Sequence, residues 1–540
     1  MQLLGKLSGP RSGQLTSGRD RVRTVALASL CLLLFLTFLD NTVVSVALGS
    51  LQSDLHASVA ELQWVIGGYA LTFAAAMLAC GMIGDEFGRK KVMLAGAGVF
   101  CAGSVLCALA PNVETLIAGR AVMGLGAAAS EPGTLSIIRQ VYTDTRERAR
   151  AIGIWAAVSG LALALGPVIG GALVGAWSWR GIFWFNLAFG LAALIAAGVT
   201  VPESSDPTAS RVDTLGTVLG AGALACLMFA IIDSEDSGFG ATEVIVLLCA
   251  AVVLAVAFVI WERRVTHPLL DLRFFRLPRF TVPNVVAFFT YLATFAIFFF
   301  TALYLVEVPG DSGYQVALVF APMTVAMIIG SLVAGYWTGR VGPRWPVTIG
   351  CAAFAAGLLI ASPQITQHPD YVGLSLALAL AGAGIGITVV PVTAAVLDAV
   401  PPERSGMAAS AANTSREIGA VAGASILGAL VFSRLSATLD SHLATLSVPA
   451  SDKAAILAFK PLIIQVLETG QINSYLSKYA SEGGLIAQVE GAAYAAFGDG
   501  LHAAFYLSAA LVIVAGILAA VTLGKHPARA DASEELTAGV

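Results

Sequence analysis

Charged residues are scarce in this sequence of 540 residues: Asp, Glu, Lys and Arg make up 12% of it, whereas soluble chains carry about 25%. Apolar residues make up 57%, and the mean hydropathy is +0.83. A soluble enzyme divided into several water-facing domains is therefore excluded. Neither sign of charge dominates, with 30 Lys and Arg against 34 Asp and Glu and no basic block, so we expect no nucleic-acid partner.

Residues for metal, disulfide or catalytic chemistry are equally sparse. The seven cysteines lie inside apolar runs without a pairing rhythm, which indicates small core or lipid-facing side chains rather than disulfides or metal ligands. The six histidines are far apart, and the sequence has no phosphate-binding Walker A loop and no G-x-S-x-G nucleophile elbow. We therefore predict a chain that is not an enzyme and that has no metal site.

Long apolar runs fill most of the chain. A helix needs about 20 apolar residues to cross the core of a bilayer, and backbone polar groups must be paired there, which favours helices. We therefore predict an all-α integral membrane protein with fourteen transmembrane helices. The predicted spans are 25–48, 62–83, 92–110, 113–138, 149–175, 180–201, 212–232, 242–261, 281–307, 314–338, 344–362, 371–398, 404–432 and 499–524.

Lys and Arg are unevenly divided between alternate loops. With the amino terminus in the cytoplasm, the cytoplasmic segments hold 23 of them and the outer segments hold 5, while Arg120 and Arg416 lie within spans. The positive-inside rule therefore predicts cytoplasmic amino and carboxyl termini and an even number of spans. The outer segment 433–498 does not fit a span, because its apolar stretch 457–467 is too short; it could form amphipathic surface helices.

The turn after the second predicted span is rich in glycine and charge, and reads Gly81-Met-Ile-Gly84-Asp85-Glu86-Phe87-Gly88-Arg89-Lys90-Lys91. Two helices reverse direction here, so we expect Gly84 and Gly88 where backbones approach closely. Asp85 can accept hydrogen bonds from the N–H groups of a helix start, and Arg89 can pair with an acid of a neighbouring loop. A plain cytoplasmic turn with positive-inside charges explains the same residues equally well.

The fifth predicted span contains Gly160-Leu-Ala-Leu-Ala-Leu-Gly166-Pro167-Val-Ile-Gly170-Gly171. Proline and clustered glycine destabilise a helix unless a bend or a close helix contact requires them. Pro167 therefore predicts a bend, although close packing alone would also account for the glycines. Three further distinctive stretches are Leu39-Asp40-Asn41-Thr42 through Leu48, Gly119-Arg120-Ala-Val-Met-Gly124-Leu-Gly126, and Trp179-Arg180-Gly-Ile-Phe-Trp-Phe-Asn186.

Together these stretches resemble the motifs of the major facilitator superfamily, and in particular of its fourteen-span drug:proton antiporters. The turn at 81–91 is similar to motif A, with Glu86 where many members have arginine. The stretch 160–171 is similar to motif C, which is associated with the antiporter members, and 119–126 is similar to motif B. The resemblance covers residues 25–524, although its sharp motifs all lie before residue 190.

The resemblance implies a major facilitator fold, with two six-helix halves and two extra central spans. The expected parts are a cytoplasmic tail (1–24), an N-terminal six-helix half (25–201), two extra spans with a cytoplasmic linker (202–280), a C-terminal six-helix half with the outer loop (281–524), and a cytoplasmic tail (525–540). A degenerate copy of motif A in the second half indicates that the two six-helix halves arose by duplication. Aligning Gly88 with Gly342 retains the glycines but puts Gly339 in place of Asp85.

Ionisable residues inside spans are costly and point to function; here they are Asp40, Arg120, Glu131, Glu307, Asp398, Arg416 and Glu417. Asp40 and Arg120 lie at similar depths in their spans, which predicts that they pair. The pair is either a fixed structural ion pair, or Asp40 binds the coupling proton while Arg120 tunes its affinity. The family resemblance favours the second reading.

Glu131 lies eleven residues beyond Arg120, so both face one side of a helix about 16 Å apart. Glu131 could be a second proton site, attract a cationic substrate, or reach the cytoplasmic interface. Arg416 and Glu417 are adjacent and point about 100° apart, so we expect only Arg416 at the cavity or between helices. Glu307 and Asp398 lie near span ends and are expected at the membrane interface.

The resemblance implies a proton-coupled antiporter that exports amphipathic compounds, cations among them, by alternating access, with the proton gradient as energy source and no cofactor. In the state closed to the cytoplasm, Asp85 would cap the span that begins at 404 and Arg89 would meet Asp144 or Glu147. The alternatives are a dedicated exporter of one native metabolite, antibiotic or lipid, and a non-transporting membrane sensor. We expect a small-molecule substrate, protons and the lipid bilayer as partners, and a monomer in a bacterial inner membrane.

Overall fold

The computed structural model describes residues 12–524 except 58, 204–212, 238–239, 267, 269, 312, 402–403 and 445–484. The described residues form fourteen long helices, one short helix and three 3-10 turns, without a strand. The helices are α1 (Ser12–Val43), α2 (Leu48–Leu55), α3 (Val59–Phe87), α4 (Arg89–Ala108), α5 (Val113–Val141), α6 (Thr145–Ala176), α7 (Arg180–Thr200), α8 (Thr214–Ser237), α9 (Thr242–Glu262), α10 (Pro278–Glu307), α11 (Gly313–Val341), α12 (Arg344–Ala361), α13 (Tyr371–Asp398), α14 (Ser405–Ala444) and α18 (Leu485–Thr522).

Most of these helices qualify as membrane spans. Within the described part of the chain, eleven are long and apolar enough to cross a membrane, and thirteen are if the bent helices α3 and α6 each count as one span. The remaining long helix, α5, carries buried Arg120 and Glu131 and packs against α3 and α4. The all-helical membrane architecture is therefore confirmed, whereas the count of fourteen spans stays a prediction.

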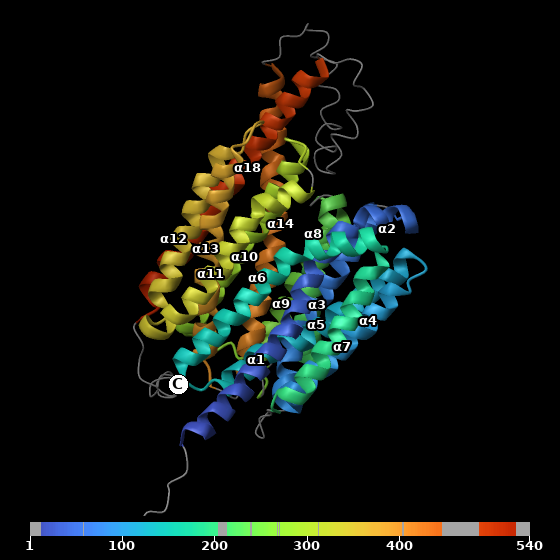
Figure 1. Ribbon diagram of the computed structural model, residues 1–540. Coiled ribbons are helices and arrows are strands. Elements are labelled where there is room, and N and C mark those ends of the chain that lie inside the picture. Colours follow the sequence, from blue (N-terminus) through green and yellow to red (C-terminus); the bar gives the residue numbers. More distant parts are fainter. Residues whose placement is uncertain are drawn as a thin grey trace, which may run out of the picture.

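The helices form two groups, α1 to α7 and α10 to α18, which Figure 1 shows side by side. Their connections alternate between two ends of the bundle. The α3–α4, α5–α6, α9–α10, α11–α12 and α13–α14 connections lie at one end, the lower end in Figure 1. We call this the basic end, because most of the Lys and Arg residues lie there, and the other the opposite end. The two groups meet mainly through α6 against α11 and α3 against α14.

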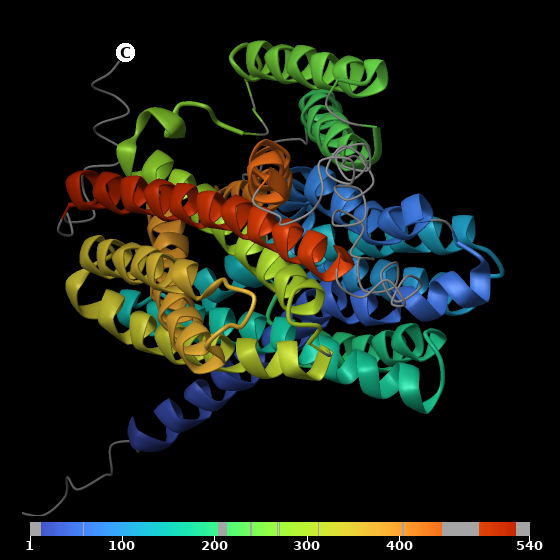
Figure 2. The ribbon, with the colours of Figure 1, turned by 90° about the horizontal axis from the view of Figure 1, so that it is seen from above.

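The helix pair α8 and α9 lies outside both groups, as the view in Figure 2 shows. It packs on α3, where the rings of Trp64 and Phe229 are 4.6 Å apart. The outer face of α9 is left uncovered, and Val252 and Val253 are 62% and 66% exposed. An apolar helix face of this kind is suited to contact with lipid. These are the helices that the sequence predicts as two extra spans.

The two groups repeat one turn geometry. Gly88, between α3 and α4, has φ of 108°, and Gly342, between α11 and α12, has φ of 80°. Glycine adopts this left-handed region without the steric cost that a side chain would add. The alignment of Gly88 with Gly342 that the sequence suggests therefore joins two residues with the same backbone requirement.

Helices α14 and α18 extend into the predicted outer segment 433–498. They contain 40 and 38 residues, which corresponds to lengths of about 60 Å and 57 Å, well beyond the hydrocarbon core of about 30 Å. The helices run past the predicted spans because apolarity stops at the edge of the bilayer, while helical hydrogen bonding does not. The surface helices suggested for this segment fall largely on 445–484, outside the described residues.

Close contact between α4 and α5 depends on glycine. A Cβ atom at Gly126 would overlap the backbone N of Phe100 and lie 2.7 Å from the carbonyl oxygen of Gly96. Because backbone cannot move aside as a flexible side chain can, Gly126→Ala should destabilise the protein by about 1–3 kcal/mol, measured as a lowered midpoint of thermal unfolding in detergent.

Gly98, also on α4, is the matched control for Gly126. A Cβ atom there would meet nothing within 4 Å. Gly98→Ala should leave stability unchanged or raise it by up to about 1 kcal/mol, because alanine has the higher helix propensity. Equal midpoints for the two variants would show that close packing at Gly126 is not needed.

Candidate functional site

Asp40 is fully buried inside the N-terminal group of helices. Its Oδ2 atom forms an ion pair with Nη1 of Arg120, and its Oδ1 atom accepts a hydrogen bond of 2.7 Å from Nδ2 of Asn186. The predicted pairing of Asp40 with Arg120 is confirmed. The contact with Asn186 was not predicted, although this residue ends one of the distinctive stretches of the sequence.

Arg120 is held on several sides, which fixes its orientation. Its Nε donates to the carbonyl oxygen of Val65 at 3.0 Å, and its guanidinium lies 4.5 Å from the centre of the Tyr69 ring. The helices α3 and α5 can approach this closely because Gly124 has no side chain: a Cβ atom there would overlap Thr72 and the carbonyl of Tyr69. The result is a buried, hydrogen-bonded ion pair, the arrangement in which a charge is tolerated away from water.

Glu131 is also buried, with 4% of its surface exposed, but it is not paired in the same way. Its Oε2 atom has no hydrogen-bond partner among the described residues. The side chain is enclosed by protein, so the alternative in which it reaches the cytoplasmic interface is wrong. A buried carboxyl oxygen without a partner is costly and points to a functional role.

Arg416 lies between helices, as the sequence suggests. Its Nη1 donates to Oδ1 of Asn413 at 2.9 Å, and its Nη2 donates to the hydroxyl of Thr393 on α13. The guanidinium is 5.7 Å from the ring of Trp155 on α6 and 5.6 Å from the ring of Tyr291 on α10. Both distances are within the range of cation–π attraction.

Glu417 follows Arg416 on α14. The charges of both residues act on Glu131 and on Tyr291. The expectation that only Arg416 lies at the cavity or between helices is met by the contacts of Arg416, and for Glu417 it stays a prediction. We call the group Glu131, Trp155, Tyr291, Arg416 and Glu417 the charged junction; it joins α5 and α6 to α10 and α14.

Tyr69 lies beside the ion pair, with its ring under the Arg120 guanidinium. The charges of Asp40 and Arg120 act on it, and those of Glu131 and Glu417 act on it as well. Its hydroxyl donates to the carbonyl oxygen of Thr37 at 3.4 Å. Tyr69 is therefore part of the surroundings of the ion pair and also feels the charges of the junction.

Asp85 bridges the two groups at the basic end. Its Oδ1 and Oδ2 atoms each accept a hydrogen bond of 3.2 Å, from the backbone N–H groups of Gly406 and Met407 in the first turn of α14. The predicted capping of this helix by Asp85 is confirmed. A carboxylate at a helix start satisfies unpaired N–H groups and interacts favourably with the helix dipole.

Arg89 pairs with Asp85 itself, at 2.7 Å. The partners suggested by the sequence have other contacts: Asp144 caps α6 by accepting from the N–H of Glu147 at 3.0 Å, and Glu147 pairs with Arg23 at 3.4 Å. The partner of Arg89 therefore lies on the other side of the Gly88 turn, at the end of α3, and not in another loop.

The motif A glycines have different roles. Gly81 packs against α14, where a Cβ atom would overlap the Ser410 side chain, and Gly88 has the positive φ described above. The prediction of a close approach at Gly84 is wrong, because the nearest atom to a Cβ there is 3.9 Å away. The N–H of Lys90 donates to Oε1 of Glu203 at 3.2 Å.

The motif C stretch bends α6 as predicted, by 42° between Leu163 and Val168. Pro167 has no N–H, so the carbonyl of Leu163 loses its helical donor, and the hydroxyl of Thr42 on α1 donates to it instead at 3.0 Å. Gly166 and Gly170 make this contact possible, because Cβ atoms there would overlap α1. Gly160 packs in the same way against Met327 of α11, whereas a Cβ atom at Gly171 would meet nothing.

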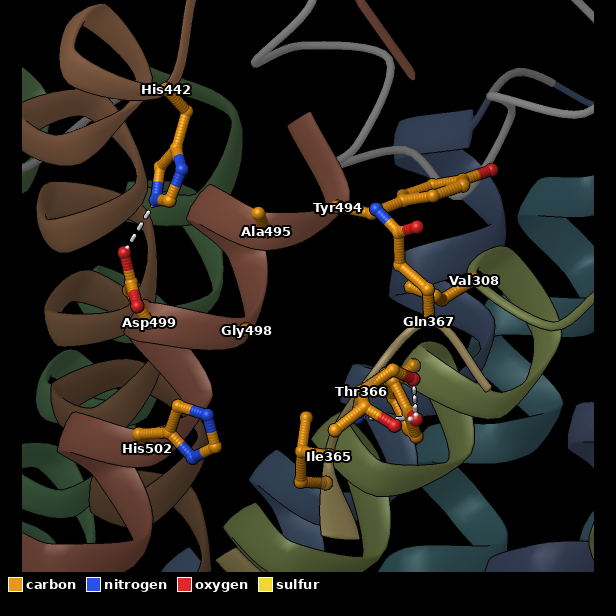
Figure 3. Close-up of a pocket in the computed structure, with 11 residues that line it drawn as sticks. Val308, Ile365, Thr366, Gln367, His442, Tyr494, Ala495, Gly498, Asp499 and His502 are labelled. Atoms are coloured by element: carbon orange, nitrogen blue, oxygen red, sulfur yellow. Dashed lines mark hydrogen bonds and ion pairs between the residues drawn. The ribbon is translucent and has the colours of Figure 1, made fainter. Parts of the chain in front are cut away.

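A pocket of about 310 Å³ lies away from all of these residues, at the opposite end of the C-terminal group. Figure 3 shows His442, Asp499 and His502 on one side of it and Thr366 and Gln367 on the other. His442 and Asp499 are 2.8 Å apart. None of the residues that the sequence predicts for the site lines this pocket.

The fold and these buried charges define a membrane-embedded bundle of the kind that carries solutes, and comparison with known proteins identifies its family. The sequence profile of the Major Facilitator Superfamily matches residues 30–424. The chain therefore belongs to the Major Facilitator Superfamily, as its motifs predicted.

Two relatives and one solved structure describe this similarity further. The chain is 33% identical to the multidrug resistance protein Stp of Mycobacterium tuberculosis over 78% of this chain and 79% of that protein. It is 30% identical to the tetracenomycin C resistance and export protein of Streptomyces glaucescens over 91% of this chain and 89% of that protein. The proton:xylose symporter XylE has the same fold, with a TM-score of 0.58 over 94% of this chain and 97% of that one, at 14% identity.

Proposed function

We propose that this protein is a proton-coupled antiporter that exports amphipathic compounds, cations among them, by alternating access. The observation that carries the proposal is the buried carboxyl oxygen of Glu131, which finds no hydrogen-bond partner in the described part of the chain and lies on α5, a helix that contacts α14 of the other group. An ionisable group inside a membrane protein is costly and is usually kept because it serves the function. Because the chain belongs to a family of membrane transporters, that function is transport. The printed names of the two relatives, a multidrug resistance protein and an antibiotic resistance and export protein, support the export of toxic compounds.

The basic end is the cytoplasmic end in this proposal, by the positive-inside rule. Asp85 then joins α3 to the start of α14 on the cytoplasmic side, where α6 also contacts α11 through Arg146 and the carbonyl of Gly339 at 3.2 Å. In this proposal these contacts close the bundle toward the cytoplasm. Both termini are cytoplasmic, the membrane is a bacterial plasma membrane, and the monomer is the working unit.

Asp40 and Arg120 couple transport to protons in this proposal. In the present state Asp40 is paired with Arg120. A proton on Asp40 removes the attraction and frees Arg120 to turn toward other partners, so protonation and the arrangement of α1, α5 and α7 become linked. Glu131 and Arg416 at the charged junction respond to the movement of one group against the other.

Export of one native compound is a second candidate. The similarity to the tetracenomycin C resistance and export protein extends over 91% of this chain, which favours it. A panel of structurally unrelated toxic compounds, tested for protection of a pump-deficient strain, separates the two. Protection against one chemical class alone supports a dedicated exporter, whereas protection against several supports the multidrug function.

Transport by the purified protein tests the proposal. Proteoliposomes that carry a proton gradient should exchange protons for a fluorescent lipophilic cation, and a protonophore should stop the exchange at once, because the gradient is the energy source. The measurement is cation uptake together with internal pH. Proton-coupled export would be contradicted if uptake were the same with and without the gradient. It would also be contradicted if uptake of every compound in the panel were no greater than in protein-free vesicles.

A further inference from the structure

The connection between α9 and α10 contains a buried carboxylate that no motif covers. Asp271 is 5% exposed. It accepts hydrogen bonds from Nη1 of Arg404 at 2.7 Å and from Nη2 of Arg273 at 2.9 Å. Arg404 lies one residue before α14, directly ahead of the N–H groups that Asp85 caps. Two carboxylates from different parts of the chain therefore hold the start of α14.

The same connection is anchored to the α8–α9 pair. Oε2 of Glu262, the last residue of α9, accepts a hydrogen bond of 3.2 Å from the N–H of Leu270. The two helices are joined at this end, because Nε1 of Trp261 donates to Asp213 at 2.7 Å and Asp213 caps α8 by accepting from the N–H of Gly216 at 2.9 Å.

The α8–α9 pair is in turn attached to the N-terminal group. Phe258 of α9 packs against Met82 of α3 and against Leu270, and the rings of Trp64 and Phe229 meet further along α3 and α8. Leu270 thus packs against α9, while its neighbour Asp271 binds Arg404. The connection spans from the N-terminal group to the start of α14, beside the bridge that Asp85 makes.

We propose that Asp271 is a second latch of the cytoplasmic gate, and that the α8–α9 pair is the anchor from which it holds α14. The latch rests on the proposed function, because it assumes that this end opens during transport. Asp271 acts through Arg404 and is therefore a positioning residue. The Arg404 side chain is 41% exposed, and an ion pair with an exposed partner is weak enough to break and re-form in each transport cycle.

The latch stays charged at physiological pH. Burial acts to raise the pKa of Asp271, but hydrogen bonds from Arg273 and the positive charges of Arg404 and Arg273 outweigh it and hold the pKa below its usual value. A lowered pKa means that the pairing is fully present above the ordinary aspartate pKa of about 3.9 and is lost only at lower pH. The effect of removing Asp271 should therefore be the same at pH 6 and pH 8.

Cysteine labelling at the gate tests the latch. Ser410 is fully buried on α14 and faces Gly81, so Ser410→Cys, with the native cysteines replaced, should react slowly while the gate is closed. Asp271→Asn and Arg404→Gln should each speed labelling about 2- to 5-fold, and the double variant should be no faster than either. Asp499→Asn is the control and should leave the rate unchanged, because Asp499 pairs with His442 at the opposite end of the bundle.

The anchor has a test of its own. Glu262→Gln keeps an oxygen acceptor for the N–H of Leu270 and should keep labelling slow, whereas Glu262→Ala should speed it as Asp271→Asn does. Unchanged labelling in Glu262→Ala would overturn the role of the α8–α9 pair.

Several results would overturn the latch itself: wild-type labelling rates in both Asp271→Asn and Arg404→Gln, additive effects in the double variant, or faster labelling that only follows a lowered thermal midpoint. Arg404→Gln, at an exposed side chain, keeps the test valid if Asp271→Asn folds poorly. Labelling needs neither substrate nor gradient. If only the proposed function is wrong, the variants will still be labelled faster than the wild type, but no transport will be measured. If only the latch is wrong, transport will be measured, but the variants will be labelled at the wild-type rate.

Discussion

Replacing Asp40 with asparagine is expected to abolish gradient-driven export. Asparagine has nearly the same size and can still bond with Asn186, but it cannot take up and release a proton. Gradient-driven accumulation of a lipophilic cation in proteoliposomes should fall to the level seen without a gradient. Exchange of labelled for unlabelled substrate, which needs no proton, should persist.

The control for Asp40→Asn addresses folding. Removing one partner of a buried ion pair costs about 3–5 kcal/mol, because the other charge is left without compensation. The double variant Asp40→Asn with Arg120→Gln removes both charges and should recover much of that stability without recovering accumulation. If Asp40→Asn pumped at the wild-type rate, the ion pair would be the fixed structural pair that the sequence also allowed.

The features that could be predicted from the sequence are those that depend only on residue type and on position along a helix. Asp40 and Arg120 were matched because equal depth in two spans puts charges at one level of the membrane. The bend at Pro167 follows from a missing N–H, and the cap by Asp85 follows from the needs of a helix start. Each rule needs only the residue type and its place along a helix.

The contacts that were missed depend on how helices rotate and pack against each other. Asn186 reaches Asp40 across 146 residues of sequence, and a helical pattern gives no rotation of α7 about its axis. The rings of Trp155 and Tyr291 meet Arg416 from two other helices, which no pattern in its own helix could give. The α8–α9 pair carried no motif, so its bridge to Arg404 through Asp271 could be seen only once the chain was folded.

Glu131→Gln is expected to separate cationic from neutral substrates. The charged junction holds two carboxylates, Glu131 and Glu417, and one guanidinium, Arg416, so it carries one net negative charge when all three are ionised. A substrate with a single positive charge neutralises it, whereas a neutral substrate gains nothing from it. Two unit charges several ångströms apart, at an effective dielectric constant of about 20, predict a loss of about 10- to 100-fold in the apparent affinity for the cation.

The fold should tolerate this change at Glu131. Glutamine has the same shape, and the Oε2 atom that it replaces has no hydrogen-bond partner among the described residues, so no hydrogen bond is lost. The measurement is the KM for a lipophilic monocation and for a neutral amphipathic compound in the same proteoliposomes. Asp499→Asn removes a carboxylate of α18 in the pocket at the opposite end and should change neither value.

The comparison of the two substrates decides what Glu131 does. A raised KM for the cation with an unchanged KM for the neutral compound makes Glu131 part of the cation site. An equal loss of gradient-driven uptake for both compounds contradicts this assignment and makes Glu131 a proton carrier beside Asp40. The two acids then differ in their surroundings alone: Asp40 is paired with Arg120 inside the N-terminal group, whereas the charges that act on Glu131 are those of Arg416 and Glu417 on the other group.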